Sequence, residues 1–254
     1  MRFLTWNIQN RPSEAPNREA EGIAEYLRKQ NADLLFLQEI PAPLLDYLST
    51  NLKVSEVIGV GRDDGERAGE FVPILILSKE LKVHSKGWFW LGPTPEIPSR
   101  SWFALCPRLC TWAILEKQGT PFFVVNNHWD HFSFYSRRRG WEQVLDKWRG
   151  VAPNHPALFT GDFNLRPTRR LFHRILKNRH QPLQDLWAAH HRGPLQHTFT
   201  GFAKQWGRAR VDHFLGTRQW QVRKCEILPT NPLFSDHRPL LLEAGLNQKE
   251  NQTA

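Results

Sequence analysis

The chain is most informative at Ala157-Leu158-Phe159-Thr160-Gly161-Asp162-Phe163-Asn164, where an apolar run stops at a glycine and two polar residues follow. An apolar run this short, bounded by a turn residue, is typical of a strand buried in a sheet. Asp162 and Asn164 are two positions apart, so they project from the same side of an extended chain. The alternative is an ordinary Asp/Asn turn, and the tetrapeptide alone does not separate the two. The surrounding runs decide between them.

Similar apolar runs recur along the chain and predict a core built on β-sheet. They lie at Arg2–Ile8, Asp33–Gln38, Phe71–Leu77, Thr111–Leu115, Pro121–Asn126, Arg210–Leu215 and Leu240–Glu243. Strand and helix patterns are mixed and do not strictly alternate. Two long polar stretches, Gly61–Glu70 and Gly87–Pro107, are predicted to be loops that face the substrate.

Four segments have the apolar spacing of amphipathic helices. In the first, Asn17 is a candidate N-cap, and the apolar positions that follow are Ala20, Ile23, Ala24 and Leu27. The other three are Leu44–Leu52, Ser136–Trp148 and Thr168–Leu176.

Size and composition narrow the class of protein. The 254 residues are 40% hydrophobic, and we expect a single domain over residues 1–246 followed by a polar tail at 247–254. The net charge of +9 favours a polyanionic partner such as nucleic acid or anionic lipid, although a solvated basic surface gives the same value. Three cysteines support neither a disulfide framework nor a zinc ribbon. Without a signal peptide or a run of about 20 apolar residues, the protein is expected to be soluble and cytoplasmic.

Polar residues repeatedly follow the point where an apolar run stops. Asn7 ends the first run, Glu39 follows Leu34–Leu37, and His128 follows the run that begins at Pro121. Buried strands bring their ends to a common edge of a sheet, so these side chains can converge in one cleft with Asp162.

The residue types at these positions point to metal and acid–base chemistry. Glu39 and Asp236 are hard oxygen donors of the kind that Mg²⁺ prefers, and Asn7 adds a neutral donor. His128 and His237 each have an acid nearby that can set their protonation state. Taken singly, a carboxylate is more often a helix cap and a histidine is more often a packed core residue. Their joint occurrence favours a site.

Six motifs occur in the order found in the endonuclease/exonuclease/phosphatase superfamily, which has the deoxyribonuclease I-like fold. They are Thr5-Trp6-Asn7, Gln38-Glu39, Asn127-His128-Trp129-Asp130-His131, Gly161-Asp162-Phe163-Asn164, Arg210-Val211-Asp212-His213 and Ser235-Asp236-His237-Arg238-Pro239. The chain resembles this superfamily from residue 5 to 239. The resemblance implies an α/β fold, a four-layer α-β-β-α sandwich in which two mixed β-sheets pack face to face.

The same resemblance implies a metal-dependent hydrolase of phosphodiester bonds. Its cofactor would be Mg²⁺, with Mn²⁺ able to replace it. Glu39 would be the principal ligand, assisted by Asn7 and Asp236.

The resemblance also assigns the catalytic roles. Asp162 would activate or orient the attacking water, and Asn164 would hold the phosphate. His128 and His237 would contact phosphoryl oxygens. Asp212 would orient His237 and favour its protonated form, which stabilises the charge of the transition state.

His128 separates branches of the superfamily. Abasic-site endonucleases similar to exonuclease III usually carry Tyr there, whereas deoxyribonuclease-like, sphingomyelinase-like, inositol-phosphatase-like and deadenylase-like members carry His. His128 with Arg137 and Arg138 after it, together with Thr198–Phe202, looks most like small bacterial members near the nocturnin and carbon catabolite repressor-type deadenylase branch.

The chain departs from the commoner pattern at Asn127, Trp129 and His213, where Thr, Leu and Tyr are usual. Trp129, Arg137 and Arg166 are candidate substrate-binding residues. Trp129 beside His128 can alter the shape of the phosphate pocket, and the two arginines can line a track for phosphates. His213 either titrates beside Asp212 or packs inertly. Most of the eleven tryptophans are expected to fill the interior.

A nuclease acting on RNA or DNA is the leading expectation, with a nucleic acid or nucleotide as substrate and no obligate protein partner. One alternative is a phospholipid hydrolase of the sphingomyelinase type, or a small-molecule phosphoester phosphatase, with the same site. Another is a catalytically inactive nucleic-acid-binding protein. The intact set of eight motif residues speaks against an inactive protein.

Overall fold

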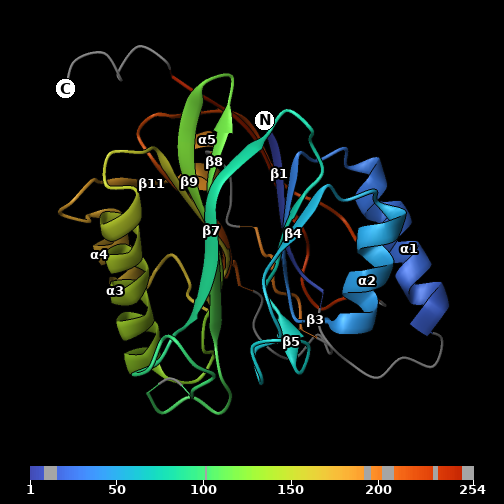
Figure 1. Ribbon diagram of the computed structural model, residues 1–254. Coiled ribbons are helices and arrows are strands. Elements are labelled where there is room, and N and C mark those ends of the chain that lie inside the picture. The colour runs from blue at the N-terminus through green and yellow to red at the C-terminus, as the bar shows by residue number, and fades with distance from the viewer. Residues whose placement is uncertain (9–15, 101, 192–195, 202–208, 231–233, 248–254) are drawn as a thin grey trace.

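The computed structural model describes residues 1–8, 16–100, 102–191, 196–201, 209–230 and 234–247. Two six-stranded mixed sheets pack face to face, and helices cover both outer faces (Figure 1). The helices are α1 (Pro16–Lys29), α2 (Ala42–Asn51), α3 (Phe134–Val151), α4 (Arg170–Leu176) and α5 (Leu186–His190). Helices α1 and α2 lie outside one sheet, and α3 and α4 lie outside the other. The predicted four-layer sandwich is confirmed.

The first sheet combines strands from both parts of the sequence. Its order is β13 (Trp220–Ile227), β14 (Leu240–Leu246), β1 (Arg2–Asn7), β2 (Leu34–Gln38), β6 (Ile74–Ile76) and β4 (Glu56–Ile58). Strands β1 and β2 run parallel, whereas β14 pairs with β1 in the antiparallel direction. The late strand β14 therefore sits beside the first strand of the chain.

The second sheet is formed by the middle of the sequence. Its order is β11 (Leu183–Asp185), β12 (Asp212–Thr217), β10 (Ala157–Asp162), β9 (Thr120–His128), β8 (Leu109–Lys117) and β7 (Lys82–Trp90). Strands β9 and β10 run parallel, and β12 is antiparallel to β10. A small ribbon of β3 (Ile40–Pro41) and β5 (Glu70–Phe71) lies apart from both large sheets.

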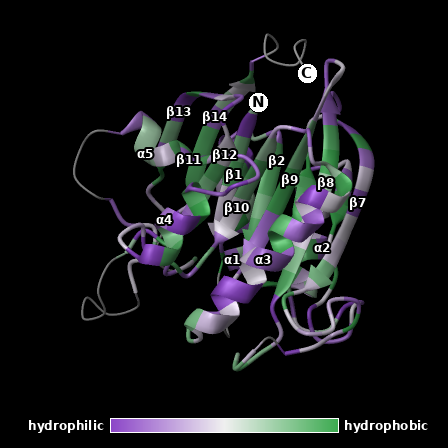
Figure 2. Cartoon of the chain, turned by 90° about the vertical axis from the view of Figure 1, so that its left-hand side faces the viewer, coloured by the Kyte–Doolittle hydropathy of each residue, from purple (hydrophilic) through white to green (hydrophobic). Residues whose placement is uncertain are grey.

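Three hydrophobic layers hold the sandwich together. Between the sheets, Phe3 and Phe36 of the first sheet meet Phe122 and Phe214 of the second, all fully buried. Helices α1 and α2 pack on the first sheet and α3 and α4 on the second, so the central strands are buried on both faces, and Figure 2 shows them mostly in the colour of hydrophobic residues. Strands buried on both faces give the continuous apolar runs seen in the sequence. Among the described residues, no helix has the length and apolarity that a membrane crossing requires.

Most predicted elements are present, with corrected boundaries. The run Phe71–Leu77 is divided between β5 and β6, because Pro73 interrupts the pairing. Gly87–Trp90 belongs to β7, so the loop predicted at Gly87–Pro107 begins later, and Glu70 is paired in β5. Asn17 lies inside α1 and does not cap it. Phe202 and, of the tail predicted at 247–254, residues 248–254 lie outside the described residues.

Burial agrees with the apolar patterns of the sequence. The buried positions of α1 are Ala20, Ile23, Ala24 and Leu27, as the helical spacing predicts. Eight of the ten tryptophans among the described residues are buried, which confirms their expected place in the interior. The cysteines Cys106, Cys110 and Cys225 are free thiols.

Gly161 is required where β10 passes β9. Its φ is +118°, and a Cβ added there would overlap the carbonyl oxygen of Asn127 and lie 2.8 Å from its nitrogen. We expect Gly161→Ala to lower the free energy of unfolding by about 2–4 kcal/mol, since it combines overpacking with a strained φ. Urea denaturation measures this change.

Gly119→Ala is the matched control for Gly161→Ala. Gly119 also has a positive φ, of +75°, but nothing lies within 4 Å of an added Cβ. In the control, the free energy of unfolding should fall only by the cost of the strained φ, about 1–2 kcal/mol. An equal loss in both variants would show that the close approach of β9 and β10 is not the cause.

Candidate active site

Strand register brings the predicted polar residues to one end of the sandwich. Because β1 and β2 are parallel, Asn7 at the end of β1 and Glu39 directly after β2 lie at the same edge. In the second sheet, His128 and Asp212 are both register partners of Asp162. Five residues far apart in the sequence thus meet at strand ends. The pattern of apolar runs predicted this for four of them, and Asp212 was expected from the family resemblance.

The two sheets are joined at this end by side-chain hydrogen bonds. The Asn7 Nδ2 donates to Glu39 Oε1 at 2.9 Å and to Asp162 Oδ2 at 3.2 Å, and the second bond crosses from one sheet to the other. A second crossing lies deeper, where Gln38 Nε2 donates to Asn126 Oδ1 at 2.7 Å. Asn7 and Asp162 are 1% and 2% exposed, so water competes little for these bonds.

His237 is held by an acid on one side of its ring. Its Nδ1 donates to Asp212 Oδ2 at 2.9 Å, and its Nε2 lies 3.8 Å from Asp162 Oδ2. Burial alone would lower the pKa of His237, but the charge of Asp212 and its hydrogen bond raise that pKa to about 10. The imidazole is therefore protonated at neutral pH and presents an N–H toward Asp162.

The loop that carries His237 is fastened to β1. The Trp6 Nε1 donates to the carbonyl oxygen of His237 at 3.0 Å, and Ser235 Oγ donates to the carbonyl oxygen of Asn7 at 2.6 Å. On the other side, Thr198 Oγ1 accepts from the backbone nitrogen of Asp212 at 3.2 Å. Both members of the His–Asp pair are thus fixed through backbone contacts.

Asp162 lies between two histidines. His128 Nε2 and His237 Nε2 are each 3.8 Å from its Oδ2, and the backbone nitrogen of Asn164 donates to its Oδ1 at 2.8 Å. Burial and the nearby charge of Asp212 raise the pKa of Asp162. A carboxylate with a raised pKa is a better proton acceptor than an ordinary aspartate, which suits a general base.

His128 lies beside a cation, whereas His237 is paired with an acid. Burial and the neighbouring Arg108 guanidinium lower the pKa of His128 well below its ordinary value. Arg108 Nη1 lies 2.9 Å from the Nε2 and 3.2 Å from the Nδ1 of His128, and Arg108 Nη2 lies 3.0 Å from the Nδ1 of His131. Since arginine only donates, the His128 nitrogen facing it is an acceptor. The two histidines therefore differ in charge.

Glu39 and Asp236 have the chemistry of a divalent-cation site. Burial raises the pKa of Asp236, and the charge of Glu39 adds to that effect. Two carboxylates that repel each other across one space, with the amide of Asn7 beside them, offer the hard oxygen donors that Mg²⁺ and Mn²⁺ take. The set fits such an ion because a bound dication removes the repulsion.

A second group of potential ligands fits a cation less well. Asp162, Asp212 and His237 place ligand atoms within 4.8 Å of one another. The imidazole of His237 is protonated and already bonded to Asp212, and a metal ligand must be neutral imidazole. This group suits proton transfer and charge stabilisation.

Two of the predicted residues have left-handed backbone. The φ of Glu39 is +56° and that of Asn164 is +46°. Such conformations cost about 1–3 kcal/mol for a residue with a side chain and cluster at functional sites. Asn164 is held in place by its Nδ2, which donates to the carbonyl oxygen of Trp129 at 2.9 Å.

These side chains open into one cavity of about 370 Å³. Of the predicted set, it is lined by Glu39, His128, Asp162, Asn164, Asp236 and His237. Sequence reasoning did not assign the further lining residues Arg62, Glu70, Cys106, Arg108, His131 and Phe199 to the site. In the sequence, these residues were marked only by their place in or directly after the long polar stretches, or in the motifs around His128 and Thr198.

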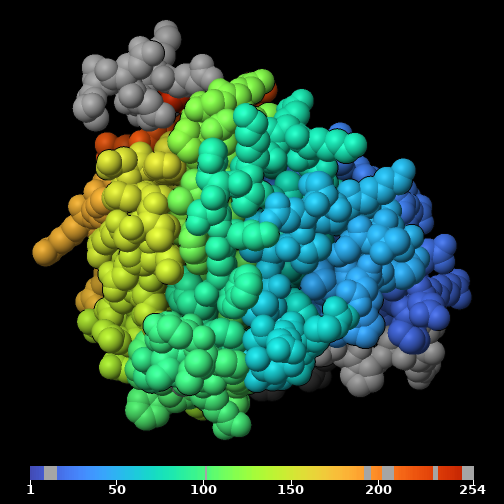
Figure 3. Space-filling view, viewed as in Figure 1, coloured from blue at the N-terminus to red at the C-terminus, as the bar shows by residue number. Residues whose placement is uncertain are grey.

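Two loops form one rim of this cavity. Segments 59–70 and 90–108, residue 101 excepted, lie side by side at the lower edge of the molecule (Figure 3). Trp90 Nε1 donates to the carbonyl oxygen of Arg62 at 2.7 Å and joins them. Arg62 in turn pairs with Glu70 inside the cavity. The two polar stretches predicted to face the substrate do supply cavity residues.

The candidate substrate-binding residues are placed differently from one another. The Trp129 indole is 1% exposed and packs on Trp141 and Phe163, so its contribution to the site is its backbone carbonyl. Arg137 and Arg166 line a hollow next to the cavity.

His213 is a packed core residue. Its Nε2 donates to the carbonyl oxygen of Leu165 at 2.8 Å, and its Nδ1 accepts from Arg210 at 3.0 Å. Burial and the charge of Arg210 lower the pKa of His213 to about 4. The surroundings of His213 therefore agree with inert packing, the second of the two predicted alternatives.

Residues 4–237 match the Endonuclease/Exonuclease/phosphatase family. The chain belongs to this family. Enzymes of the family are phosphoester hydrolases that use divalent metals, and the order of the six motifs is explained by this membership.

The curated relatives of this family member are only partial matches. Tyrosyl-DNA phosphodiesterase 2 of Homo sapiens is 25% identical over 166 residues, which are 65% of this chain and 42% of the relative. The same protein from Xenopus tropicalis is 28% identical over 167 residues, or 65% of this chain and 40% of the relative. The chain thus matches well under half the length of these relatives.

Solved structures of the family match almost the whole chain. An endonuclease/exonuclease/phosphatase from Bacteroides vulgatus has a TM-score of 0.88 and 28% identity, covering 97% of this chain and 98% of that one. The mannosyl-6-phosphatase Bt3783 of Bacteroides thetaiotaomicron has a TM-score of 0.83 and 26% identity, covering 97% and 100%. The human nocturnin catalytic domain, at 16% identity and a TM-score of 0.77 over 97% and 93%, shares the fold.

Proposed function

We propose that this chain is a divalent-metal-dependent phosphodiesterase that cleaves nucleic acid. The observation that carries the proposal is the set of contacts made by Asp162. This buried carboxylate is hydrogen-bonded to Asn7, which also bonds Glu39, and it faces a charged and a neutral histidine at 3.8 Å each. A proton acceptor, two phosphate donors and a cation site thereby share one cavity.

Glu39, Asp236 and Asn7 would hold the cation, with Mg²⁺ as the ion we expect and Mn²⁺ as its substitute. When bound, the ion neutralises the phosphate, which otherwise repels an approaching hydroxide. The remaining residues do the work of positioning and proton transfer. Asn7 links the two functions, because its side chain contacts both Glu39 and Asp162.

Asp162 would accept the proton of the attacking water, since its raised pKa matches that task. His237 would donate from Nε2 to a phosphoryl oxygen and stabilise the added negative charge as an imidazolium. Asp212 is a positioning residue that holds the ring of His237 through Nδ1. Neutral His128 and the amide of Asn164 would complete the phosphate contacts.

Charge around the cavity favours nucleic acid among the phosphodiesters. Arg62 and Arg108 line the cavity itself, and Arg137, Arg166 and Arg169 line the adjoining hollow of about 700 Å³. A net charge of +9 acts in the same direction. A strand of phosphates matches such a surface better than one small ester does. The tyrosyl-DNA phosphodiesterases among the relatives agree with a nucleic-acid substrate.

A sugar-phosphate phosphatase is the second candidate, because Bt3783 resembles the chain over nearly the full length of both proteins. The cavity of about 370 Å³ is large enough for a monosaccharide phosphate. The two candidates share one chemistry and differ in whether the phosphate carries one ester bond or two.

A substrate panel is expected to separate them. We expect metal-dependent hydrolysis of single-stranded RNA, oligoadenylate, or single- or double-stranded DNA, because the cationic surface extends beyond one phosphate. Sphingomyelin, inositol phosphates and mannose 6-phosphate belong in the same panel. Each substrate is measured with Mg²⁺, with Mn²⁺ and with chelator.

Chelator should abolish every activity that depends on the proposed site. Hydrolysis of mannose 6-phosphate without cleavage of any nucleic acid would replace the first candidate by the second. Tight binding of nucleic acid with no hydrolysis of any ester would instead support an inactive binding protein.

A further inference from the structure

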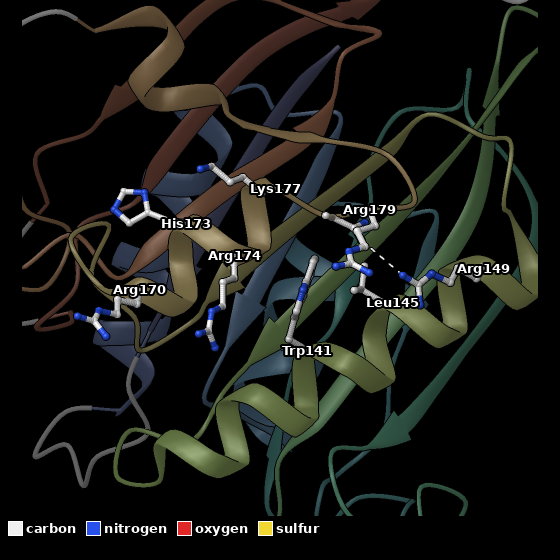
Figure 4. A pocket seen from close by; sticks show the side chains of 9 residues that line it. Trp141, Leu145, Arg149, Arg170, His173, Arg174, Lys177 and Arg179 are labelled. Carbon is white, nitrogen blue, oxygen red and sulfur yellow. Dashed lines mark hydrogen bonds between the residues drawn. The ribbon is translucent and has the colours of Figure 1, made fainter.

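A basic pocket lies between α3 and α4, outside the cavity described above. It measures about 620 Å³, and Trp141 and Leu145 of α3 provide its apolar part (Figure 4). The charged residues around it are Arg149, Arg170, Arg174, Lys177 and Arg179, joined by His173. No carboxylate is among the described residues that line it.

The cations of this pocket are poorly neutralised by the protein. Within the described ranges, Arg149 alone of the five has a carboxylate within 4.0 Å, the exposed Asp146 at 3.5 Å. Like charges gathered around one hollow repel each other, and an anion bound there offsets the repulsion.

A buried amide distinguishes the pocket from an ordinary basic surface. Asn178 lines it and is only 7% exposed. Its Oδ1 accepts from Arg149 Nη2 at 3.5 Å and from the backbone nitrogen of His180 at 3.4 Å. Its Nδ2 is buried with no hydrogen-bond partner among the described residues. Unsatisfied buried donors are rare, and an oxyanion in the pocket would supply the missing acceptor once the amide turns toward it.

The pocket is continuous with the cavity through basic residues. Arg170 lines both this pocket and the hollow that contains Arg137 and Arg166. That hollow shares His131 and Asn164 with the cavity. A chain of anionic groups can therefore reach from Asp162 to α4 along surfaces lined by arginine.

We propose that the α3–α4 pocket binds the phosphate backbone of a polynucleotide whose reacting phosphate lies in the cavity. The inference rests on the proposed nuclease function. It adds a second site on the protein, which binds the same polynucleotide away from the phosphate that reacts. An extended polyanion is favoured over a free phosphate because the basic residues continue between the two sites. The apolar surface of Trp141 and Leu145 suits the sugar or base beside the bound phosphate.

The test compares two variants with a charge-matched control. Arg174→Gln with Arg179→Gln removes two cations from the pocket, and Asn178→Asp replaces the unpaired donor by a carboxylate of the same shape. The control is Arg218→Gln with Arg223→Gln, which removes two exposed cations, one directly after β12 at the end remote from Asp212 and one within β13. Thermal unfolding establishes that all variants fold.

Binding of a long fluorescent single-stranded oligonucleotide is measured in chelator, and hydrolysis of bis(p-nitrophenyl) phosphate with Mn²⁺. The pocket variants should bind the strand more weakly than the wild type and the control. For the double variant, the slope of log affinity against log salt should fall by about 1.4, since each phosphate contact on a single strand contributes about 0.7. Hydrolysis of the small ester should not change.

Unchanged strand affinity in both pocket variants, with intact folding, overturns the proposal. A second result also overturns the proposal. If inorganic phosphate stabilises the wild type but neither pocket variant, while the affinity for the oligonucleotide is unchanged, the pocket binds a small anion. The proposed function fails separately, if the wild type cleaves no polynucleotide at all. In that case weaker strand binding by the variants still supports the pocket as a polyanion site.

Discussion

Replacing His237 by alanine is expected to lower the rate of phosphoester hydrolysis by about 10²- to 10³-fold, the usual effect of removing one donor to the transition state. His237 is the residue that faces Asp162 as an imidazolium, with its charge maintained by Asp212. Its loss removes the donor that balances negative charge on the phosphate. Steady-state kinetics on the best substrate of the panel gives kcat and KM. The decrease should appear mainly in kcat, because the interaction strengthens in the transition state.

Two further variants sharpen the result for His237. Asp212→Asn keeps the shape of the partner but removes its charge, and it should lower kcat less than His237→Ala does. His84→Ala removes an exposed histidine that pairs with Glu116, and it should leave kcat unchanged. Wild-type kcat in a folded His237→Ala protein would falsify the assignment of His237.

Replacing Glu39 by glutamine is expected to weaken binding of Mn²⁺ and to lower metal-dependent hydrolysis by orders of magnitude. The substitution preserves size and the hydrogen bond that Asn7 donates, but it removes one of the two carboxylates that face the proposed cation. Hard dications bind chiefly through carboxylate charge. Calorimetric titration with Mn²⁺ measures the affinity without reference to activity.

Glu70→Gln is the matched control for Glu39→Gln. Glu70 lines the same cavity, but it pairs with Arg62. This control should bind Mn²⁺ with an affinity close to that of the wild type. Equal loss of Mn²⁺ binding in both variants would mean that the cavity attracts cations through its overall charge. Unchanged Mn²⁺ binding in both variants would mean that Glu39 is not a ligand of the cation.

The motif residues could be placed from the sequence because their positions follow from strand register. Asn7, Glu39, His128 and Asp162 each end or directly follow an apolar run, and parallel neighbours align such ends. Arg108 was not predicted to join them. Its position depends on the path of segment 90–108, and that path is set by contacts such as Trp90 with Arg62 that have no periodic signal.

The strands of the two large sheets that sequence reasoning missed share one property. Strands β4 and β13 are the edges of the first sheet, and β7 and β11 are the edges of the second. An edge strand buries less of its surface, so its apolar run is short or broken by polar residues, as in Lys82–Trp90. In β13 a register shift between Val222 and Lys224 also interrupts the alternation. Central strands have neither weakness.

The pairing of β14 with β1 has a consequence during synthesis of the protein on the ribosome. Asn7 and Glu39 emerge early, but Asp236 and His237 emerge just ahead of β14, which must insert between β13 and β1. A nascent chain that lacks this strand has neither a complete first sheet nor the full catalytic set. Such long-range pairing is slow to form, so acquisition of activity should coincide with the last step of folding.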